Sequence, residues 1–185
     1  MHLSLDGFAA GPNGEMDWIK VEQEIFDHVG KRINKGDTSL YGRVTYELME
    51  SYWPTAANKP NATKHDIEHA KWYSKVHKVV LSRSMKDRSL ANTTIISENL
   101  ADSINEMKRS RNESNEDILL FGSPTATHAL MQLNLIDGYW LFANPIILGR
   151  GIPLFKDIKE KTKLKLLTTH QFTCGVVELN YTVDN

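Results

Sequence analysis

The sequence has 185 residues, of which 41% are hydrophobic and 24% are charged, and its formal net charge is −1. This length suits one domain with a full hydrophobic core, and the near-zero charge argues against binding to nucleic acid or an anionic membrane. No apolar run approaches the roughly 20 residues that span a bilayer, and we expect no secretion signal. The one cysteine, Cys174, excludes an internal disulfide and fits a reducing compartment such as the cytoplasm.

The first segment, residues 2–10, alternates between apolar and polar residues and then meets the turn formers 11–14. We therefore expect a strand, followed by a loop that returns through Trp18. Asp6 lies beside Gly7 at the end of this strand. Its carboxylate can serve as a turn-forming group or as a polar group that faces a ligand, and the local pattern leaves both roles open.

Strand and helix patterns then alternate along the chain. The predicted elements are, in order, helix 22–34 ended by 35–37, strand 38–42, a helix from 43, loop 51–64, a helix capped by Thr63 and ending at Ser74, strand 77–82, strand 93–97, helix 100–111, exit loop 112–116, strand 118–121 and a helix from Pro124. After Gly138 only strands follow, over 139–147, 163–172 and 175–183. We predict one α/β domain over residues 1–185, with a mixed, mainly parallel sheet and antiparallel C-terminal strands.

Three predicted strands end in residues suited to an anion: Gly42-Arg43-x-Thr45, Ser82-Arg83-Ser84 and Gly122-Ser123-x-Thr125. Ligands of open parallel sheets sit beyond the carboxyl ends of the strands, and a glycine before a helix lets a phosphate approach the backbone. Arginine at a helix start opposes the helix dipole unless an anion lies between them. Each segment alone also fits an ordinary turn, but their spacing together favours one extended ligand with phosphates at two places.

The segment from His65 to His69 matches the zinc pattern H-x-x-E-H. The surrounding sequence is rich in charge and no third ligand is apparent. A solvated helix face explains the pattern better, and we expect no metal.

The chain resembles a known family through a set of motifs that occur in the family's order: SLDGFAAGPNGEMDW, GRVTYE, YWP, VVLSRS, LLFGSPTATHAL and NPIILGRGIPLF. They resemble the dihydrofolate reductase-like superfamily and, more closely, the family built on the reductase domain of riboflavin biosynthesis. The resemblance implies a dihydrofolate reductase-like three-layer fold with helices on both faces of the sheet. It also implies an NADPH-dependent reductase, similar to 5-amino-6-(5-phosphoribosylamino)uracil reductase, that acts on a small pterin- or pyrimidine-like heterocycle.

The resemblance further assigns residues by position. The residues implied to contact NADPH are Gly42, Arg43 and Thr45 at its phosphates, Ser82 and Arg83 near its 2′-phosphate, and Gly122, Ser123 and Thr125 around its pyrophosphate. Asp6 and Trp18 would border the nicotinamide and the substrate, with Asp6 as the candidate catalytic group. The resemblance also implies a homodimer. A non-catalytic nucleotide-binding protein of the same fold remains the alternative.

Overall fold

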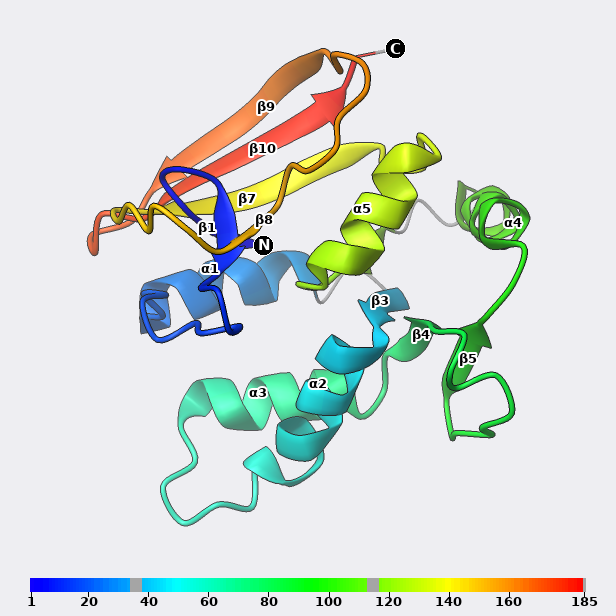
Figure 1. The fold of residues 1–185 in the computed structure, drawn as a ribbon. Helices are drawn as coiled ribbons and strands as arrows, with labels where there is room; N and C mark the ends of the chain where they lie inside the picture. Colours follow the sequence, from blue (N-terminus) through cyan, green and yellow to red (C-terminus); the bar gives the residue numbers. More distant parts are fainter. Residues whose placement is uncertain (34–37, 113–116, 185) are drawn as a thin grey trace. The chain divides into compact units, whose positions relative to one another are not determined.

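The computed structural model describes residues 1–33, 38–112 and 117–184. They form two compact units, unit 1 with Met1–Glu22 and Pro124–Asn185, and unit 2 with Gln23–Ser123 (Figure 1). The single domain over residues 1–185 stays a prediction. The predicted helix end at 35–37 and most of the predicted exit loop, residues 113–116, lie outside the described residues.

Unit 2 is built on a four-stranded parallel sheet with the strand order β5-β4-β3-β6. Its strands are β3 (Thr38–Gly42), β4 (His77–Leu81), β5 (Thr93–Ile96) and β6 (Ile118–Leu120). Its helices are α1 (Gln23–Ile33), α2 (Arg43–Ala56), α3 (Lys64–Tyr73) and α4 (Leu100–Asn112). Because all four strands run in one direction, their carboxyl ends lie along one edge of the sheet.

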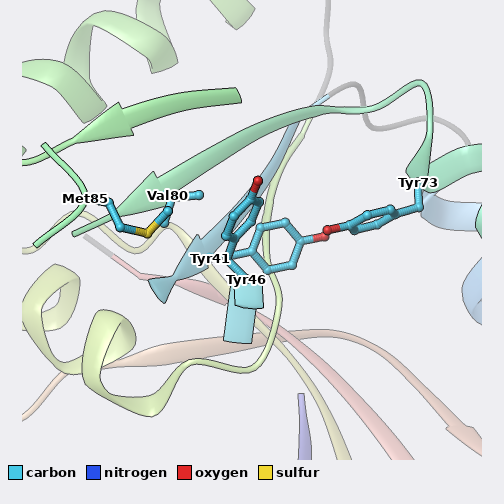
Figure 2. Packing of buried hydrophobic residues seen from close by; sticks show 5 residues of the cluster. All are labelled: Tyr41, Tyr46, Tyr73, Val80 and Met85. Atoms are coloured by element: carbon cyan, nitrogen blue, oxygen red, sulfur yellow. The ribbon is translucent and has the colours of Figure 1, made fainter. Parts of the chain in front are cut away.

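The two central strands of this sheet are buried on both faces, as is usual for parallel sheets, since residues 38–41 of β3 and 78–80 of β4 are all buried. Tyr41 and Val80 lie on one face and pack with Tyr46 of α2, Tyr73 of α3 and Met85 (Figure 2). The alternate strand residues, which point to the opposite face, are buried as well, as Leu40 and Val79 show. Aromatic and β-branched packing therefore fixes the strands whose ends carry the predicted cofactor residues.

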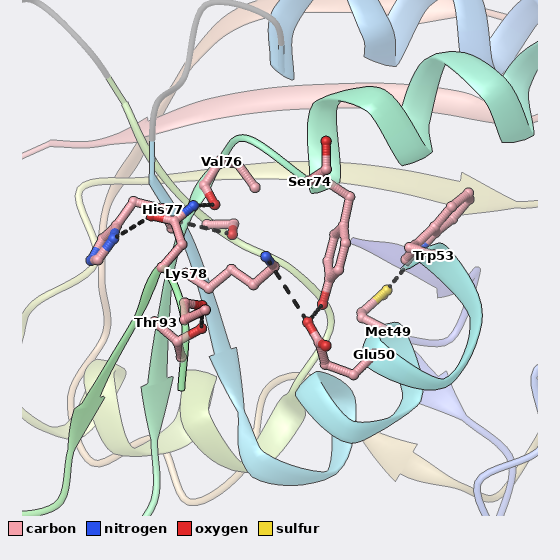
Figure 3. Close-up of polar contacts among 12 residues, drawn as sticks. Met49, Glu50, Trp53, Ser74, Val76, His77, Lys78 and Thr93 are labelled. Carbon is pink, nitrogen blue, oxygen red and sulfur yellow. Dashed lines mark hydrogen bonds and ion pairs between the residues drawn. The ribbon is translucent and has the colours of Figure 1, made fainter. Parts of the chain in front are cut away.

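One charged group lies inside this apolar region, near the amino end of β4. The Nζ of Lys78 is 4.0 Å from Oε1 of Glu50 (Figure 3), and it lies 4.4 Å from the centre of the Tyr73 ring. The Tyr73 hydroxyl donates to the same glutamate oxygen at 2.8 Å. Burial lowers the pKa of Lys78, against the opposing attraction of Glu50. The group ties α2, α3 and β4 together, and its place at the start of the strand separates it from the carboxyl edge.

The predicted loop over 51–64 is wrong in its first part, because α2 continues to Ala56 with Pro54 inside it. Tertiary packing explains the extension. Trp53 packs against the core cluster, and its indole N–H donates to the sulfur of Met49 at 3.0 Å. Since Pro54 lies in the last turn, its missing N–H removes only one helical hydrogen bond.

Unit 1 contains a mixed sheet with the order β1-β7-β10-β9 and a short β2–β8 ladder. Its elements are β1 (His2–Ser4), β2 (Phe8–Ala10), α5 (Pro124–Gln132), β7 (Gly138–Asn144), β8 (Ile152–Pro153), β9 (Leu164–Gln171) and β10 (Val177–Val183). β1 is parallel to β7, and β10 is antiparallel to both β7 and β9. The predicted α/β class, with parallel strands and antiparallel C-terminal strands, is confirmed, although the described strands are divided among separate sheets.

The predicted strand over residues 2–10 is wrong in one respect, because a turn divides it into β1 and β2. The Gly7 N–H donates to the carbonyl of Ser4 at 3.0 Å, and Gly7 has φ +86°. Glycine adopts this left-handed conformation at little cost. The turn places Asp6 just beyond the carboxyl end of β1.

Candidate functional site

The carboxyl ends of β3 and β6 form a topological switch point. From β3 the chain passes through α2 and α3 to β4 on one side, and after β5 and α4 it reaches β6 on the other side. In open α/β sheets, ligands bind in the crevice outside such strand ends. Gly42 ends β3, and Gly122 follows β6 by two residues, so two of the predicted turns meet at this point.

A short polar turn joins these two strand ends. Gly122 and Ser123 both have left-handed φ values, +53° and +57°. The Ser123 hydroxyl accepts the N–H of Gly42 at 2.9 Å and donates to the carbonyl of Phe121 at 3.1 Å. A left-handed non-glycine residue costs about 1–3 kcal/mol and persists only where its surroundings fix it, often at functional sites. The Ser123 hydroxyl supplies that restraint.

In the structure, Thr45 is the neighbour of Gly122. A Cβ atom added there would lie 3.4 Å from Cγ2 of Thr45 and 3.7 Å from its hydroxyl oxygen. Thr45, in the first turn of α2, therefore packs beside the turn that follows β6. The structure brings Gly42, Thr45, Gly122 and Ser123 together, and a side chain at 122 would meet conformational strain because of the left-handed φ.

Positive charge lies at the same edge. Arg43 is the first residue of α2, and Gly42 before it gives the helix no side-chain cap. The Arg43 guanidinium pairs with Oε2 of Glu47 at 2.7 Å, and the two side chains are 43% and 44% exposed. Exposed ion pairs contribute little stability. The guanidinium can therefore exchange this carboxylate for an anion near the uncapped helix start.

Ser82 and Arg83 follow β4 at this edge. The Ser82 N–H donates to the Ile96 carbonyl at 3.0 Å, which joins the ends of β4 and β5. The Ser82 and Ser84 hydroxyl oxygens are 3.3 Å apart, and Arg83 is exposed. The edge thus holds every predicted cofactor residue of unit 2. Thr125 is exposed in the first turn of α5, which belongs to unit 1.

Asp6 has a different environment at the carboxyl end of β1. Its carboxylate accepts the N–H of Leu148 at 3.1 Å and the N–H of Gly149 at 2.7 Å. Hydrogen bonds from the Ser4 hydroxyl, and then from Gly149 and Leu148, lower the pKa of Asp6. The side chain is therefore a carboxylate at neutral pH. It holds the turn after β1 to the loop after β7 and is not a proton donor in this state.

Two polar side chains that the sequence did not single out organise the loop carrying Trp18. The Asn144 amide oxygen accepts the N–H of Lys20 at 2.9 Å, while its amide nitrogen lies within hydrogen-bond distance of Leu3 O, Phe142 O and His2 Nδ1. The Glu15 carboxylate accepts the N–H and the side-chain amide of Asn13. The Trp18 indole N–H donates to the Glu15 carbonyl at 3.0 Å. Sequence spacing could not show the ties of Asn144, because they join residues far apart in the chain, whereas the ties of Glu15 lie within one loop.

The histidines of the H-x-x-E-H segment lie among aromatic rings. His65 stacks on Phe26 with 3.5 Å between ring centres, and His69 lies 4.0 Å from the ring centre of Trp53. Burial lowers the pKa of His69 to about 3. Within residues 1–33, 38–112 and 117–184, no three metal-ligating side chains come together. Over the same residues, no helix is long and apolar enough to cross a bilayer.

Two proteins of Bacillus subtilis (strain 168) are similar to the chain in sequence. The uncharacterized protein YyaP is 33% identical over 182 residues, which cover 97% of this chain and 90% of YyaP. The uncharacterized protein YwjB is 27% identical over 180 residues, with 97% and 92% of the two chains covered. Both relatives match along nearly their whole length.

Solved structures share the fold at low sequence identity. A putative riboflavin biosynthesis protein from Shewanella sp. PV-4 has a TM-score of 0.73 and 18% identity, over 100% of this chain and 97% of that one. A diaminohydroxyphosphoribosylaminopyrimidine deaminase/5-amino-6-(5-phosphoribosylamino)uracil reductase from Thermotoga maritima has a TM-score of 0.65 and 14% identity, over 99% of this chain and 55% of that one. The model of the RibD C-terminal domain family matches residues 1–178. The chain therefore belongs to the RibD C-terminal domain family and has its reductase-like fold.

Proposed function

We propose that the protein is an NADPH-dependent reductase that transfers a hydride to a small pterin- or pyrimidine-like heterocycle. The observation that carries this proposal is the tied turn at the β3–β6 switch point, where Gly42, Gly122 and Ser123 meet. Glycine at 122 leaves the backbone open to a close ligand, as a phosphate requires. Family membership and the reductase-like fold support the same class of reaction.

The residues at this edge fit a dinucleotide with phosphates. Gly122 and Ser123 would hold the pyrophosphate, and Arg43 would neutralise part of its charge after leaving Glu47. Ser82 and Arg83 would bind the 2′-phosphate, because a guanidinium offers paired hydrogen bonds to phosphate oxygens. When bound, NADPH supplies a hydride to a polarised C=N or C=O group.

The residues of unit 1 supply the substrate part of the proposal. Their role would be positional: the hydrogen bonds of Asp6, Asn144 and Glu15 would hold in place the loops around Trp18. Because the hydrogen bonds to Asp6 keep it ionised, the proton that balances hydride transfer would come from water. We also propose a cytoplasmic location, where the free thiol of Cys174 stays reduced.

We further propose a homodimer that uses the outer edge of unit 1. Every residue of β9 is exposed, and the strand lies at the edge of its sheet. Leu164, Leu166 and Leu167 are 38%, 48% and 54% exposed. A long edge strand with apolar side chains is prone to pair with another chain. Light scattering at micromolar concentration should give the mass of a dimer, and a monomer mass would contradict this part of the proposal.

The test of function combines binding and turnover. NADPH should raise the unfolding temperature more than NADH or FMN, since ligands that bind only the folded state stabilise it. NADPH consumption is then followed with a panel of pterins, pyrimidines and quinones. Oxidation of NADPH with a pterin or pyrimidine supports the reductase. Binding without turnover across the panel favours the non-catalytic nucleotide-binding alternative, and no shift with any nucleotide would overturn both.

A further inference from the structure

An open hollow lies at the carboxyl ends of β4 and β5, one strand away from the β3–β6 turn. Its lining residues are Arg83, Lys86, Ser97, Glu98 and Asn99. The first two follow β4 and the last three follow β5, and these strands are parallel neighbours. Since adjacent strands are about 4.8 Å apart, the hollow is within reach of a dinucleotide whose pyrophosphate lies at β3 and β6.

The hollow contains one carboxylate among its cations. The Nζ of Lys86 is 2.6 Å from Oε1 of Glu98, and the two side chains are 57% and 67% exposed. Arg83 forms no ion pair with any described residue. Glu98 therefore neutralises Lys86, one of the two cations near a bound 2′-phosphate, whereas Arg83 remains free to bind the phosphate.

We propose that Glu98 determines cofactor preference by limiting the advantage of NADPH over NADH. This inference rests on the proposed function and identifies a residue that sets its cofactor specificity. A 2′-phosphate that binds Lys86 would also approach the negative charge of Glu98, and this repulsion weakens binding. A ribose 2′-hydroxyl instead donates a hydrogen bond to a carboxylate, as acidic residues do in NAD sites. The hollow thus accepts both cofactors, with Arg83 favouring NADPH and Glu98 favouring NADH.

The test measures dissociation constants of NADPH and NADH by calorimetry for the full chain and for Glu98→Gln. Glutamine keeps the shape, removes the charge and releases Lys86. The ratio of the NADH to the NADPH dissociation constant should rise about tenfold, through tighter NADPH and weaker NADH binding, because one close charge–charge interaction is worth about this factor. The matched control is Glu68→Gln on α3, which removes the same charge from unit 2 outside the hollow and, like Glu98, pairs with an exposed lysine, Lys64, at 3.9 Å; its ratio should match that of the parent protein.

Two outcomes would overturn the inference separately. If the parent protein binds both cofactors and Glu98→Gln leaves the ratio unchanged, Glu98 has no role in specificity although the proposed function stands. If the parent protein binds neither cofactor, the proposed function fails and this inference fails with it. A companion variant, Lys86→Gln, should weaken NADPH and leave NADH within twofold, and equal weakening of both cofactors would also contradict the assignment.

Discussion

Polar side chains at the strand ends of the two units have different partners: side chains in unit 2 and backbone groups in unit 1. In unit 2, Arg43 and Lys86 are exposed and pair with other exposed side chains. In unit 1, Asp6 and Asn144 accept backbone N–H groups from neighbouring loops. An exposed ion pair can exchange its partner at little cost, whereas removing an acceptor of a backbone N–H leaves that donor unsatisfied. Substitutions at the carboxyl edge of the unit 2 sheet should therefore alter ligand binding, whereas substitutions of Asp6 or Asn144 in unit 1 should lower the stability of the fold.

The largest effect is expected from Gly122→Val. Valine would have to adopt φ +53° and place its Cβ 3.4 Å from Thr45, so the turn should shift away from its ligand-binding shape. NADPH affinity should fall about a hundredfold or more, which corresponds to about 2.7 kcal/mol. Calorimetry measures binding, and circular dichroism separates loss of the site from loss of the fold.

A control for Gly122→Val is Gly175→Ala, which introduces a side chain at φ +87° in the β9–β10 connection of unit 1. It should lower stability through the same kind of strain and leave NADPH affinity unchanged. A folded Gly122→Val protein with the affinity of the parent would remove this turn from the cofactor site.

Asn144→Leu should have the next largest effect, and it should act on stability. The side chain is 1% exposed and joins Lys20 of the loop to the ends of β1 and β7. Leucine would leave the Lys20 N–H and two carbonyls without this partner, at a cost of about 2–3 kcal/mol. Urea unfolding measures the loss, and NADPH affinity should change less than twofold.

Asn180→Leu provides the matched comparison for Asn144. Its amide donates to the Thr168 hydroxyl at 3.4 Å between β10 and β9, in an exposed position. The cost should stay below about 0.5 kcal/mol, as for surface substitutions. An equal loss in the free energy of unfolding for the two variants would show that the buried hydrogen bonds of Asn144 do not stabilise the fold more than an exposed one does.

A smaller effect is expected from Arg43→Gln. The exposed pair with Glu47 contributes little to stability, so the free energy of unfolding should change by less than about 0.5 kcal/mol. Binding of NADPH and of NADH should each weaken about tenfold, because both carry the pyrophosphate that a guanidinium holds by charge-assisted hydrogen bonds. Calorimetry with the two cofactors measures this. An Arg43→Gln protein that loses stability but keeps its cofactor affinity would contradict a ligand-binding role for this edge of unit 2.

The smallest effect concerns Asp6 and its pH dependence. Hydrogen bonds lower the pKa of Asp6 in the folded protein, so its contribution to stability is present above the ordinary carboxylate pKa and is lost as the pH falls through the folded-state pKa. Asp6→Asn should lower the unfolding temperature modestly at pH 7, since an amide oxygen can replace only one of the two acceptors. The difference from the parent should vanish in acid. A difference that persists at low pH, or altered turnover of an identified substrate without loss of stability, would point to a direct catalytic role.

The sequence predicted the elements of unit 2 well because their signals are local. Gly42 and Gly122 mark strand ends by composition, and in unit 1 Pro124 likewise marks the start of α5. The last turn of α2 was missed because the packing of Trp53 outweighs the local signal of Pro54. The turn at Gly7 is local, because its N–H donates to Ser4 three residues earlier, but the alternating pattern of residues 2–10 did not indicate it. The ties of Asn144 and Glu98 depend on residues far apart in the chain or on other strands, which periodicity and spacing do not report.

The most direct test of the central claim is to map NADPH binding by the amide resonances of the isotopically labelled protein. The largest chemical-shift changes should fall on the amides of Gly42, Arg43, Arg83 and Ser123, at the carboxyl edge of β3, β4 and β6. Amides near Lys78, at the amino end of β4, should change little. Binding that leaves the Gly42 and Ser123 amides unchanged, or no binding at all, would contradict the account.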